Sequence, residues 1–162
     1  MTSRTNRLMA TTSLAIITVA LAAFSQSSTD PGGTTAPELE TSWRVLVTPI
    51  GVPIPPFTTF STFGRNGTFI ESTQPGQGPG HGVWRRTGAQ EFGVTFEKLL
   101  FAPNGGIAGT LKVREAIRLN ASGDSYTGDA SAEAFDPSGQ PLGSFCAKTQ
   151  GTRMTVQRPS CQ

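Results

Sequence analysis

The sequence predicts an all-β protein: a single eight-stranded antiparallel up-and-down β-barrel that follows an N-terminal signal peptide. Turn-forming residues recur about every 10–15 positions, with short runs of β-branched and aromatic residues between them. The 19 Gly and 12 Pro residues are spread along the chain, which indicates many turns rather than a collagen-like or low-complexity segment. Only 15% of the residues are charged and ten are Phe, a composition that excludes an intrinsically disordered chain.

The first 24 residues have the layout of a secretory signal peptide. Arg4 and Arg7 precede a mostly apolar run over residues 8–24, and Ala20-Leu21-Ala22 supplies a small-residue cleavage pattern. An N-terminal membrane anchor is the alternative, but the run is short for a membrane span and contains four hydroxyl side chains. We therefore expect a secreted or periplasmic protein with no stable membrane insertion after cleavage.

Residues 25–37 are predicted to be a flexible polar linker, and residues 38–162 the barrel domain. The 13 Lys and Arg residues fall to 11 when Arg4 and Arg7 are removed, which equals the 11 Asp and Glu residues. A formally neutral chain offers no basic stripe, so no nucleic-acid partner is expected. Cys146 and Cys161 are the only cysteines, and an exported chain favours a disulfide between them over two free thiols.

Eight runs separated by turn signals are predicted as strands. Their expected ranges are residues 43–48, 57–63, 68–73, 83–87, 91–102, 107–120, 125–136 and 141–156. Pro-rich residues 49–56 are expected to end the first strand, and Gly-rich residues 74–82 are expected to form a long loop. Residues 96–102 and 111–119 also contain good helix formers, so a helix is the alternative there.

The pairing register of the last three hairpins favours strands over helices for residues 96–102 and 111–119. Loops at residues 103–106, 121–124 and 137–140 give three hairpins with one apolar face, while opposite charges pair on the other face. The expected pairs are Glu97 with Lys112, Glu91 with Arg118, Lys112 with Glu133, and Asp129 with Lys148. Because a slip of one residue would invert every face, this agreement supports both the strands and their register.

Eight consecutive strands would leave two exposed edges, which closure into a barrel removes. A barrel of this size holds its own side chains or one small ligand. Many of the inner positions carry small residues, which we expect to leave space inside. These positions are Gly109, Gly128, Ala130, Ala132, Ala134, Gly143, Ala147 and Gly151.

Trp43, in Thr41-Ser42-Trp43-Arg44-Val45, and Arg153 on the last strand resemble the conserved pair of the lipocalin and calycin barrels. In those barrels a G-x-W tryptophan on the first strand packs against a basic residue of the last strand; here Thr41 stands in place of the glycine. The resemblance implies a structural cation–π contact that closes the barrel base. The strand plan is also similar to the allene oxide cyclase-like barrel, and residues 78–88 (GPGHGVWRRTG) resemble a motif of bacterial exported proteins of unknown role.

Two charged residues fall on the predicted apolar face. Glu115 lies among Val and Ala side chains, and Lys98 lies between two apolar neighbours. Each should be paired, shifted in pKa or placed at the wet mouth of the barrel, and the two are not direct partners in the predicted register. They are expected to be rim residues satisfied by water or hydroxyl groups or, for Glu115, to contact a ligand or act as an acid or base. The only histidine, His81, lies in the Gly-rich loop, where Glu71 is expected to meet it.

The leading hypothesis is an exported barrel that binds a small hydrophobic molecule in its interior. The alternatives are a cofactor-independent cyclase or isomerase using Glu115, His81 or Lys98 for proton transfer, and a structural or interaction module with a filled barrel. No cofactor and no metal site are expected, because one His without clustered Cys or Asp does not form a transition-metal site. The expected ligand-contacting residues are Glu71, Trp84, Val94, Phe96, Val113 and Tyr126.

Overall fold

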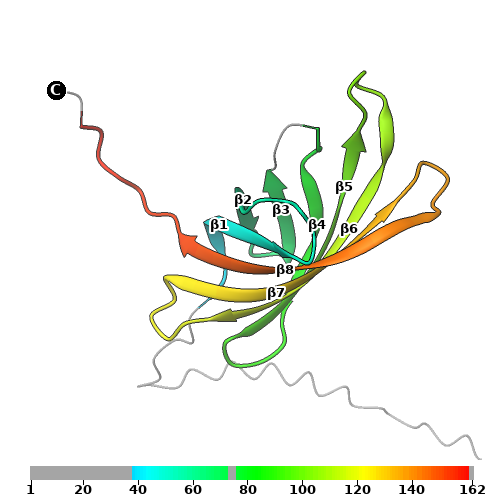
Figure 1. Cartoon of the computed structure of the whole chain (residues 1–162). Coiled ribbons are helices and arrows are strands. Elements are labelled where there is room, and N and C mark those ends of the chain that lie inside the picture. The colour runs from blue at the N-terminus through cyan, green and yellow to red at the C-terminus, as the bar shows by residue number, and fades with distance from the viewer. Residues whose placement is uncertain (1–37, 73–75, 161–162) are drawn as a thin grey trace, which may run out of the picture. The chain divides into compact units, whose positions relative to one another are not determined.

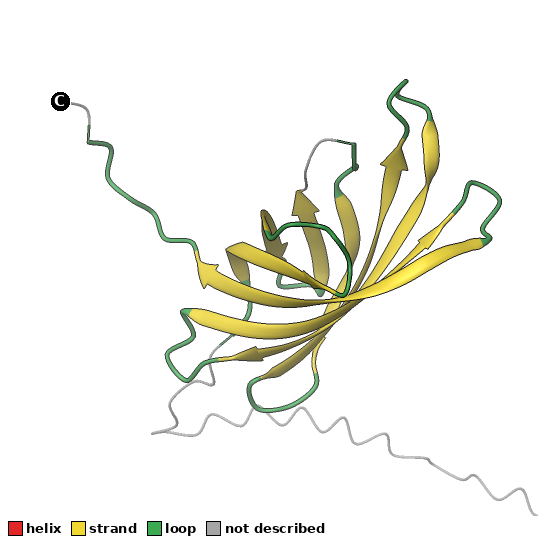
Figure 2. Ribbon diagram, viewed as in Figure 1, coloured by secondary structure: helices red, strands yellow, loops and turns green. Residues whose placement is uncertain are grey.

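The computed structural model describes residues 38–72 and 76–160, and in this part of the chain every regular element is a β-strand (Figures 1 and 2). Each strand pairs antiparallel with the next, and the last strand pairs with the first, so the sheet is a closed eight-stranded barrel. The predicted fold class is confirmed. The predicted signal peptide, the linker and Cys161 lie outside the described residues.

The strands follow one another in chain order around the barrel (Figure 1). Their bounds are β1 Thr41–Ile50, β2 Phe57–Phe63, β3 Thr68–Ser72, β4 Gly80–Arg86, β5 Glu91–Phe101, β6 Ile107–Leu119, β7 Ser125–Phe135 and β8 Pro141–Arg153. Because neighbouring strands alternate in direction, the β1–β2, β3–β4, β5–β6 and β7–β8 loops meet at one end. The other three loops, with both ends of the described chain, lie at the opposite end.

The predicted register of the last three hairpins is confirmed over most of their length. Phe92 pairs with Ile117 in β5–β6, Leu119 with Tyr126 in β6–β7, and Asp129 with Lys148 in β7–β8. The prediction is wrong only near two turns, where the register shifts after Leu100 and after Ala134. These are β-bulges, in which one strand carries an extra residue.

Most of the predicted strands differ from the observed ones by one to three residues at one end or at both. Pro49 does not end β1, which continues to Ile50 and pairs Pro49 with Ala147 of β8. The β1–β2 ladder stops at Val47, so Pro49 has a ladder on one side only and its missing N–H costs no hydrogen bond there. Strand β4 begins at Gly80, inside the segment predicted as a loop.

The outer face carries the predicted ion pairs with one correction. Lys112 Nζ lies 3.0 Å from Glu97 Oε1, and the pairs of Glu91 with Arg118 and of Asp129 with Lys148 are also present. Glu133 stands opposite Lys112 in the β6–β7 register, but it pairs instead with Arg114 at 2.9 Å. The Lys112 side chain points toward Glu97 of β5. The longer Arg114 side chain forms the ion pair with Glu133.

The substitution Lys112→Glu is expected to lower the free energy of unfolding by about 1 kcal/mol, because it places a third carboxylate between Glu97 and Glu133. Lys148→Glu is the matched control, since Lys148 has one acidic neighbour, Asp129, in its register. Urea denaturation of both variants gives the comparison. A Lys112→Glu curve that superimposes on that of the wild type would contradict the argument.

One end of the barrel is closed by packed side chains. The Trp43 ring is fully buried, and its Nε1 donates to the Leu39 carbonyl at 2.9 Å. Arg153 pairs with Trp43 in the β1–β8 ladder and holds its guanidinium carbon 4.6 Å from the Trp43 ring centroid. Tyr126 packs edge-on against the same ring, with the centroids 5.0 Å apart. The contact that the calycin resemblance implied is therefore present in this barrel.

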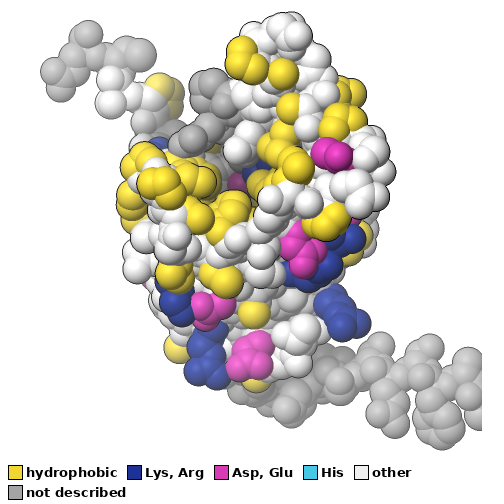
Figure 3. All heavy atoms as spheres, turned by 45° about the vertical axis from the view of Figure 1, so that its right-hand side comes forward, with side chains coloured by type: hydrophobic (Ala, Val, Ile, Leu, Met, Phe, Trp, Pro, Cys, Tyr) yellow, Lys and Arg dark blue, Asp and Glu magenta, His cyan; other side chains and the backbone are white. Residues whose placement is uncertain are grey.

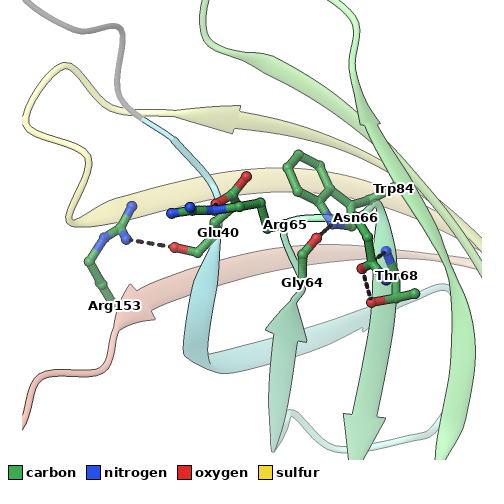
Figure 4. A network of polar contacts seen from close by, with 7 residues as sticks. All are labelled: Glu40, Gly64, Arg65, Asn66, Thr68, Trp84 and Arg153. Atoms are coloured by element: carbon green, nitrogen blue, oxygen red, sulfur yellow. Dashed lines mark hydrogen bonds and ion pairs between the residues drawn. The ribbon is translucent and has the colours of Figure 1, made fainter.

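Main-chain carbonyl groups complete this end (Figure 4). Arg153 Nη1 donates to the Glu40 carbonyl at 3.2 Å, which ties β8 to the segment that leads into β1. Trp84 Nε1 donates to the Gly64 carbonyl at 2.9 Å, which ties β4 to the β2–β3 turn. Packed side chains close this end, and the residues Ile54, Phe57 and Gln77 that line the interior cavity at the opposite end place its entrance there.

Candidate ligand cavity

The interior between the closed end and the loops at the other end holds a cavity of about 110 Å³. Its walls are mainly apolar and come from strands on all sides of the barrel. The principal wall residues are Val45, Val47, Phe69, Phe96, Leu111, Val113, Ala130, Ala132, Phe145 and Ala147. A mostly apolar concave surface with a few polar groups is the usual composition of a small-molecule site.

The open end is apolar and nearly uncharged. Ile54 and Phe57, at the β1–β2 loop, line the cavity, and Ile54 is also 43% exposed. Figure 3 shows a hollow bordered by hydrophobic side chains, with charged side chains visible inside it. Further exposed apolar side chains at this end are Ile50, Phe101, Ile107 and Leu142. Apart from Asp136, the described residues of the four loops here contain no charged side chain, so an apolar molecule meets no charged barrier at the entrance.

The small inner residues do not all leave space. Ala130, Ala132 and Ala147 line the cavity as expected. Gly151, by contrast, lies under the Tyr126 ring, and a Cβ on Gly128 would lie 2.6 Å from Glu115 Oε1. Gly109 has a φ of +150° beside the β5–β6 bulge, and a Cβ there would collide with the Phe135 carbonyl. The expected space is therefore present beside the three alanines, whereas neighbouring side chains or main chain fill the space at these three glycines.

Lys98 and Glu71 form a buried ion pair inside the barrel. Lys98 Nζ donates to Glu71 Oε2, and the residues are 6% and 4% exposed. The ammonium also lies 5.2 Å from the centroid of the Phe96 ring. Lys98 is therefore not the water-satisfied rim residue that the sequence predicted. Burial of two charges is tolerated here because each neutralises the other.

Glu115 lines the same cavity and accepts a hydrogen bond on Oε1 from the Thr149 hydroxyl at 2.5 Å. Burial raises the pKa of its carboxyl from 4.5 to about 7, the Thr149 hydrogen bond lowers the pKa, and the negative charge of Glu71 raises it. The expected rise in pKa through desolvation is confirmed. The side chain is not unpartnered, however, because Thr149 reaches it from β8.

Five of the predicted site residues meet in this cavity: Glu71, Phe96, Lys98, Val113 and Glu115. Three others do not line it. Val94 is part of the buried core, and Trp84 packs beside that core against Phe92. Tyr126 lies against Trp43, where desolvation and the charges of Glu115 and Glu71 raise the pKa of its phenol.

His81 is exposed on the outer face of β4. Its register neighbours are Ile70 and Glu97, and it lines an outer groove but not the cavity. The expected meeting of His81 with Glu71 is wrong. His81 pairs with Ile70, the residue before Glu71, so the side chains of His81 and Glu71 lie on opposite faces of the sheet. Glu71 pairs with Lys98 instead.

Two residues of the site were missed by the sequence reasoning. Thr149 orients Glu115, and Thr59 donates from its hydroxyl to the Ser72 carbonyl beside the Glu71 pair. The predicted register placed Thr149 opposite Gly128, diagonal to Glu115 across β7, so the signal for Thr149 was present. Thr59 gave no such signal, because β2 contains no charged residue that would fix its register with β3.

Cys146 is exposed on the outer face of β8. Its expected disulfide partner, Cys161, lies outside the described residues. Within residues 38–72 and 76–160, no group of three or more His, Cys, Asp or Glu side chains is arranged to hold a metal ion. The same residues include no helix of the length and hydropathy that a membrane crossing requires.

Comparisons with protein-family models, with curated proteins and with solved structures found no match to this chain. The closed eight-stranded architecture and the Trp43–Arg153 contact are consistent with a calycin-like barrel. Function has to be argued from the cavity itself.

Proposed function

We propose that this protein is an exported barrel that binds a small, largely apolar molecule in its interior. The observation that carries the proposal is the cavity of about 110 Å³, walled by apolar side chains beneath an apolar, nearly uncharged entrance. Burial of apolar surface is the main favourable term for such a ligand, at about 25 cal/mol per Å². The signal-peptide pattern of residues 1–24 supports export.

The first test is native mass spectrometry of the protein purified from its own host, which is expected to reveal a retained small molecule. A second test uses benzene as a probe, because an engineered apolar cavity of about 150 Å³ binds it. Benzene is expected to shift the methyl NMR signals of Val113 and Leu111. If the protein carries no retained molecule and benzene produces no saturable shift, the proposal is wrong.

Ala132→Leu is expected to weaken benzene binding at least about tenfold, because the added carbons occupy the cavity between β6 and β8. Ala116→Leu is the matched control: Ala116 is exposed on the outer face of β6, so the same enlargement leaves the cavity unchanged. Both variants are measured by NMR titration after their folding is checked by thermal denaturation. Equal binding by the two variants would place the probe outside the barrel.

A second candidate function, a cofactor-independent cyclase or isomerase, is favoured by one observation. Glu115 lies inside the cavity and has a pKa of about 7, which suits a general acid or base near neutral pH. If the retained molecule undergoes proton transfer, the wild type in D₂O incorporates deuterium at one of its carbon atoms and Glu115→Gln does not. If the wild type binds the molecule and no deuterium is incorporated, the cyclase or isomerase function is wrong and the binding function stands.

A further inference from the structure

The polar side chains of the cavity are mostly occupied by one another. Lys98 Nζ is paired with Glu71, and the Thr149 hydroxyl donates to Glu115 Oε1. Among the residues that the structure describes, Glu115 Oε2 has no hydrogen-bond partner. Glu115 is half-buried and lines the cavity. The second oxygen of Glu115 is therefore available to a ligand.

Two other polar side chains of the lining have no hydrogen-bond partner in the described part of the chain. Gln77 belongs to the β3–β4 loop at the entrance, so it is the outermost polar group. Ser61 lies beside Glu71 in the β2–β3 register and has a neutral hydroxyl. Glu115 is the one ionisable side chain among these three. Its protonation state therefore sets whether it can donate a hydrogen bond to a ligand or only accept one.

We propose that the ligand is a neutral, compact, apolar molecule with one hydrogen-bond acceptor oxygen, such as a ketone or an ether. This oxygen accepts a hydrogen bond from the protonated carboxyl of Glu115. The inference rests on the proposed binding function. Thr149 binds one oxygen of the carboxyl, which leaves the second oxygen without a partner among the described residues and free to bond a ligand. A ligand oxygen supplies the acceptor that a buried carboxylic acid lacks in an apolar cavity.

The charges in the cavity argue against an anionic ligand. From β3 the carboxylate of Glu71 faces the same interior as Glu115, and the cation that the described part of β5 supplies, Lys98, is already neutralised by Glu71. A further titratable group inside the barrel, the Tyr126 phenol on β7, stays protonated because burial raises its pKa. A ligand carboxylate would find no free positive charge among these groups and would lose its hydration.

The same groups set the expected pH dependence. Burial, with a smaller contribution from the charge of Glu71, raises the pKa of Glu115 to about 7 despite the opposing Thr149 hydrogen bond. Below this pH the carboxyl can donate, and above it the carboxylate cannot. Affinity for a neutral acceptor is therefore expected to fall as the pH rises from about 6 to about 8, as long as Glu115 supplies the donor.

The size of the cavity guides the choice of probes. About 110 Å³ is comparable with the apolar cavity of about 150 Å³ that holds benzene, so a six-membered ring is a suitable scale. Cyclohexane and cyclohexanone differ by one acceptor oxygen. Their affinities are measured by NMR titration for the wild type, for Glu115→Leu, which removes the donor, and for Glu115→Gln, which keeps a neutral N–H donor.

At pH 6, Glu115→Leu is expected to weaken cyclohexanone binding roughly three- to tenfold, the range for one lost hydrogen bond. Its cyclohexane affinity is expected to stay the same or to rise. Glu115→Gln is expected to keep the cyclohexanone affinity and to lose its pH dependence. The pH profile of the wild type is a readout that does not depend on whether either variant folds.

Three outcomes would count against the inference, and they are distinguishable. If cyclohexane binds and Glu115→Leu changes both affinities equally, the acceptor class is wrong while the binding function stands. If cyclohexylammonium at pH 8 binds the wild type more tightly than cyclohexanone at pH 6, the ligand is a cation paired with ionised Glu115. If neither cyclohexane nor cyclohexanone binds the wild type, the binding function fails and the inference fails with it.

Discussion

Lys98→Met is expected to lower the free energy of unfolding by about 3–5 kcal/mol, the range for removing one partner of a buried ion pair. Methionine has similar length and no charge, so the change leaves the carboxylate of Glu71 buried without its partner. The unpaired carboxylate must either stay charged in an apolar cavity or take up a proton, and both are unfavourable at neutral pH. Urea denaturation of the full chain measures the loss.

The double variant Lys98→Met with Glu71→Leu separates charge from packing. Because it removes both charges, its stability is expected to return toward that of the wild type. The matched control is Lys148→Met, which breaks the exposed pair with Asp129 and is expected to cost no more than about 1 kcal/mol. If Lys98→Met costs no more than Lys148→Met, water reaches the Lys98–Glu71 pair and the cavity is wetter than proposed.

The Lys98–Glu71 pair also shows where sequence reasoning stopped. The sequence predicts pairing only across the last three hairpins, whose short loops and alternating charges fix the register. Glu71 is on β3 and Lys98 is on β5, with Gly80 of β4 between them in the ladder. The irregular loop before β4 gave no register, so nothing in the sequence placed these two charges on one inner surface.

The last hairpins were predictable because local and tertiary signals agree. Glu97 opposite Lys112 and Asp129 opposite Lys148 are favourable on the outer face, and the same register puts Phe96 and Val113 inside. The two β-bulges were not predictable from this pattern, because each adds a residue after the last charge pair that would reveal a slip.

The amount of free space inside the barrel was harder to predict than its walls. A glycine at an inner position is compatible either with an empty cavity or with a large neighbour that folds over it. At Gly151 the neighbour is the Tyr126 ring, which packs there because it also contacts Trp43 at the closed end. Side-chain direction along the barrel decides between these cases, and residue size alone does not contain that information.

Stability is expected to fall by about 3 kcal/mol between pH 4.5 and pH 7 through the titration of Glu115 alone. Its carboxyl has a pKa of about 7 in the folded barrel and 4.5 as the ordinary value for a solvated chain. Below pH 4.5 both states are protonated and the carboxyl contributes no pH dependence. Between the two values the folded state holds a proton that the unfolded state has lost, so each pH unit costs about 1.4 kcal/mol, and above about pH 7 the loss levels off.

The difference between the wild type and Glu115→Gln isolates this effect, because all other titrating groups are common to both proteins. Glutamine keeps an acceptor for the Thr149 hydroxyl and cannot ionise, so its stability is expected to exceed that of the wild type increasingly from pH 4.5 to pH 7. Urea denaturation at half-unit pH steps provides the measurement. A difference that does not change with pH would mean that the Glu115 carboxyl has the same pKa, 4.5, in the folded barrel and in the unfolded chain, so that it is already ionised at pH 6. The hydrogen-bond donor on which the proposed ligand selection depends would then be absent, because an ionised carboxylate can only accept.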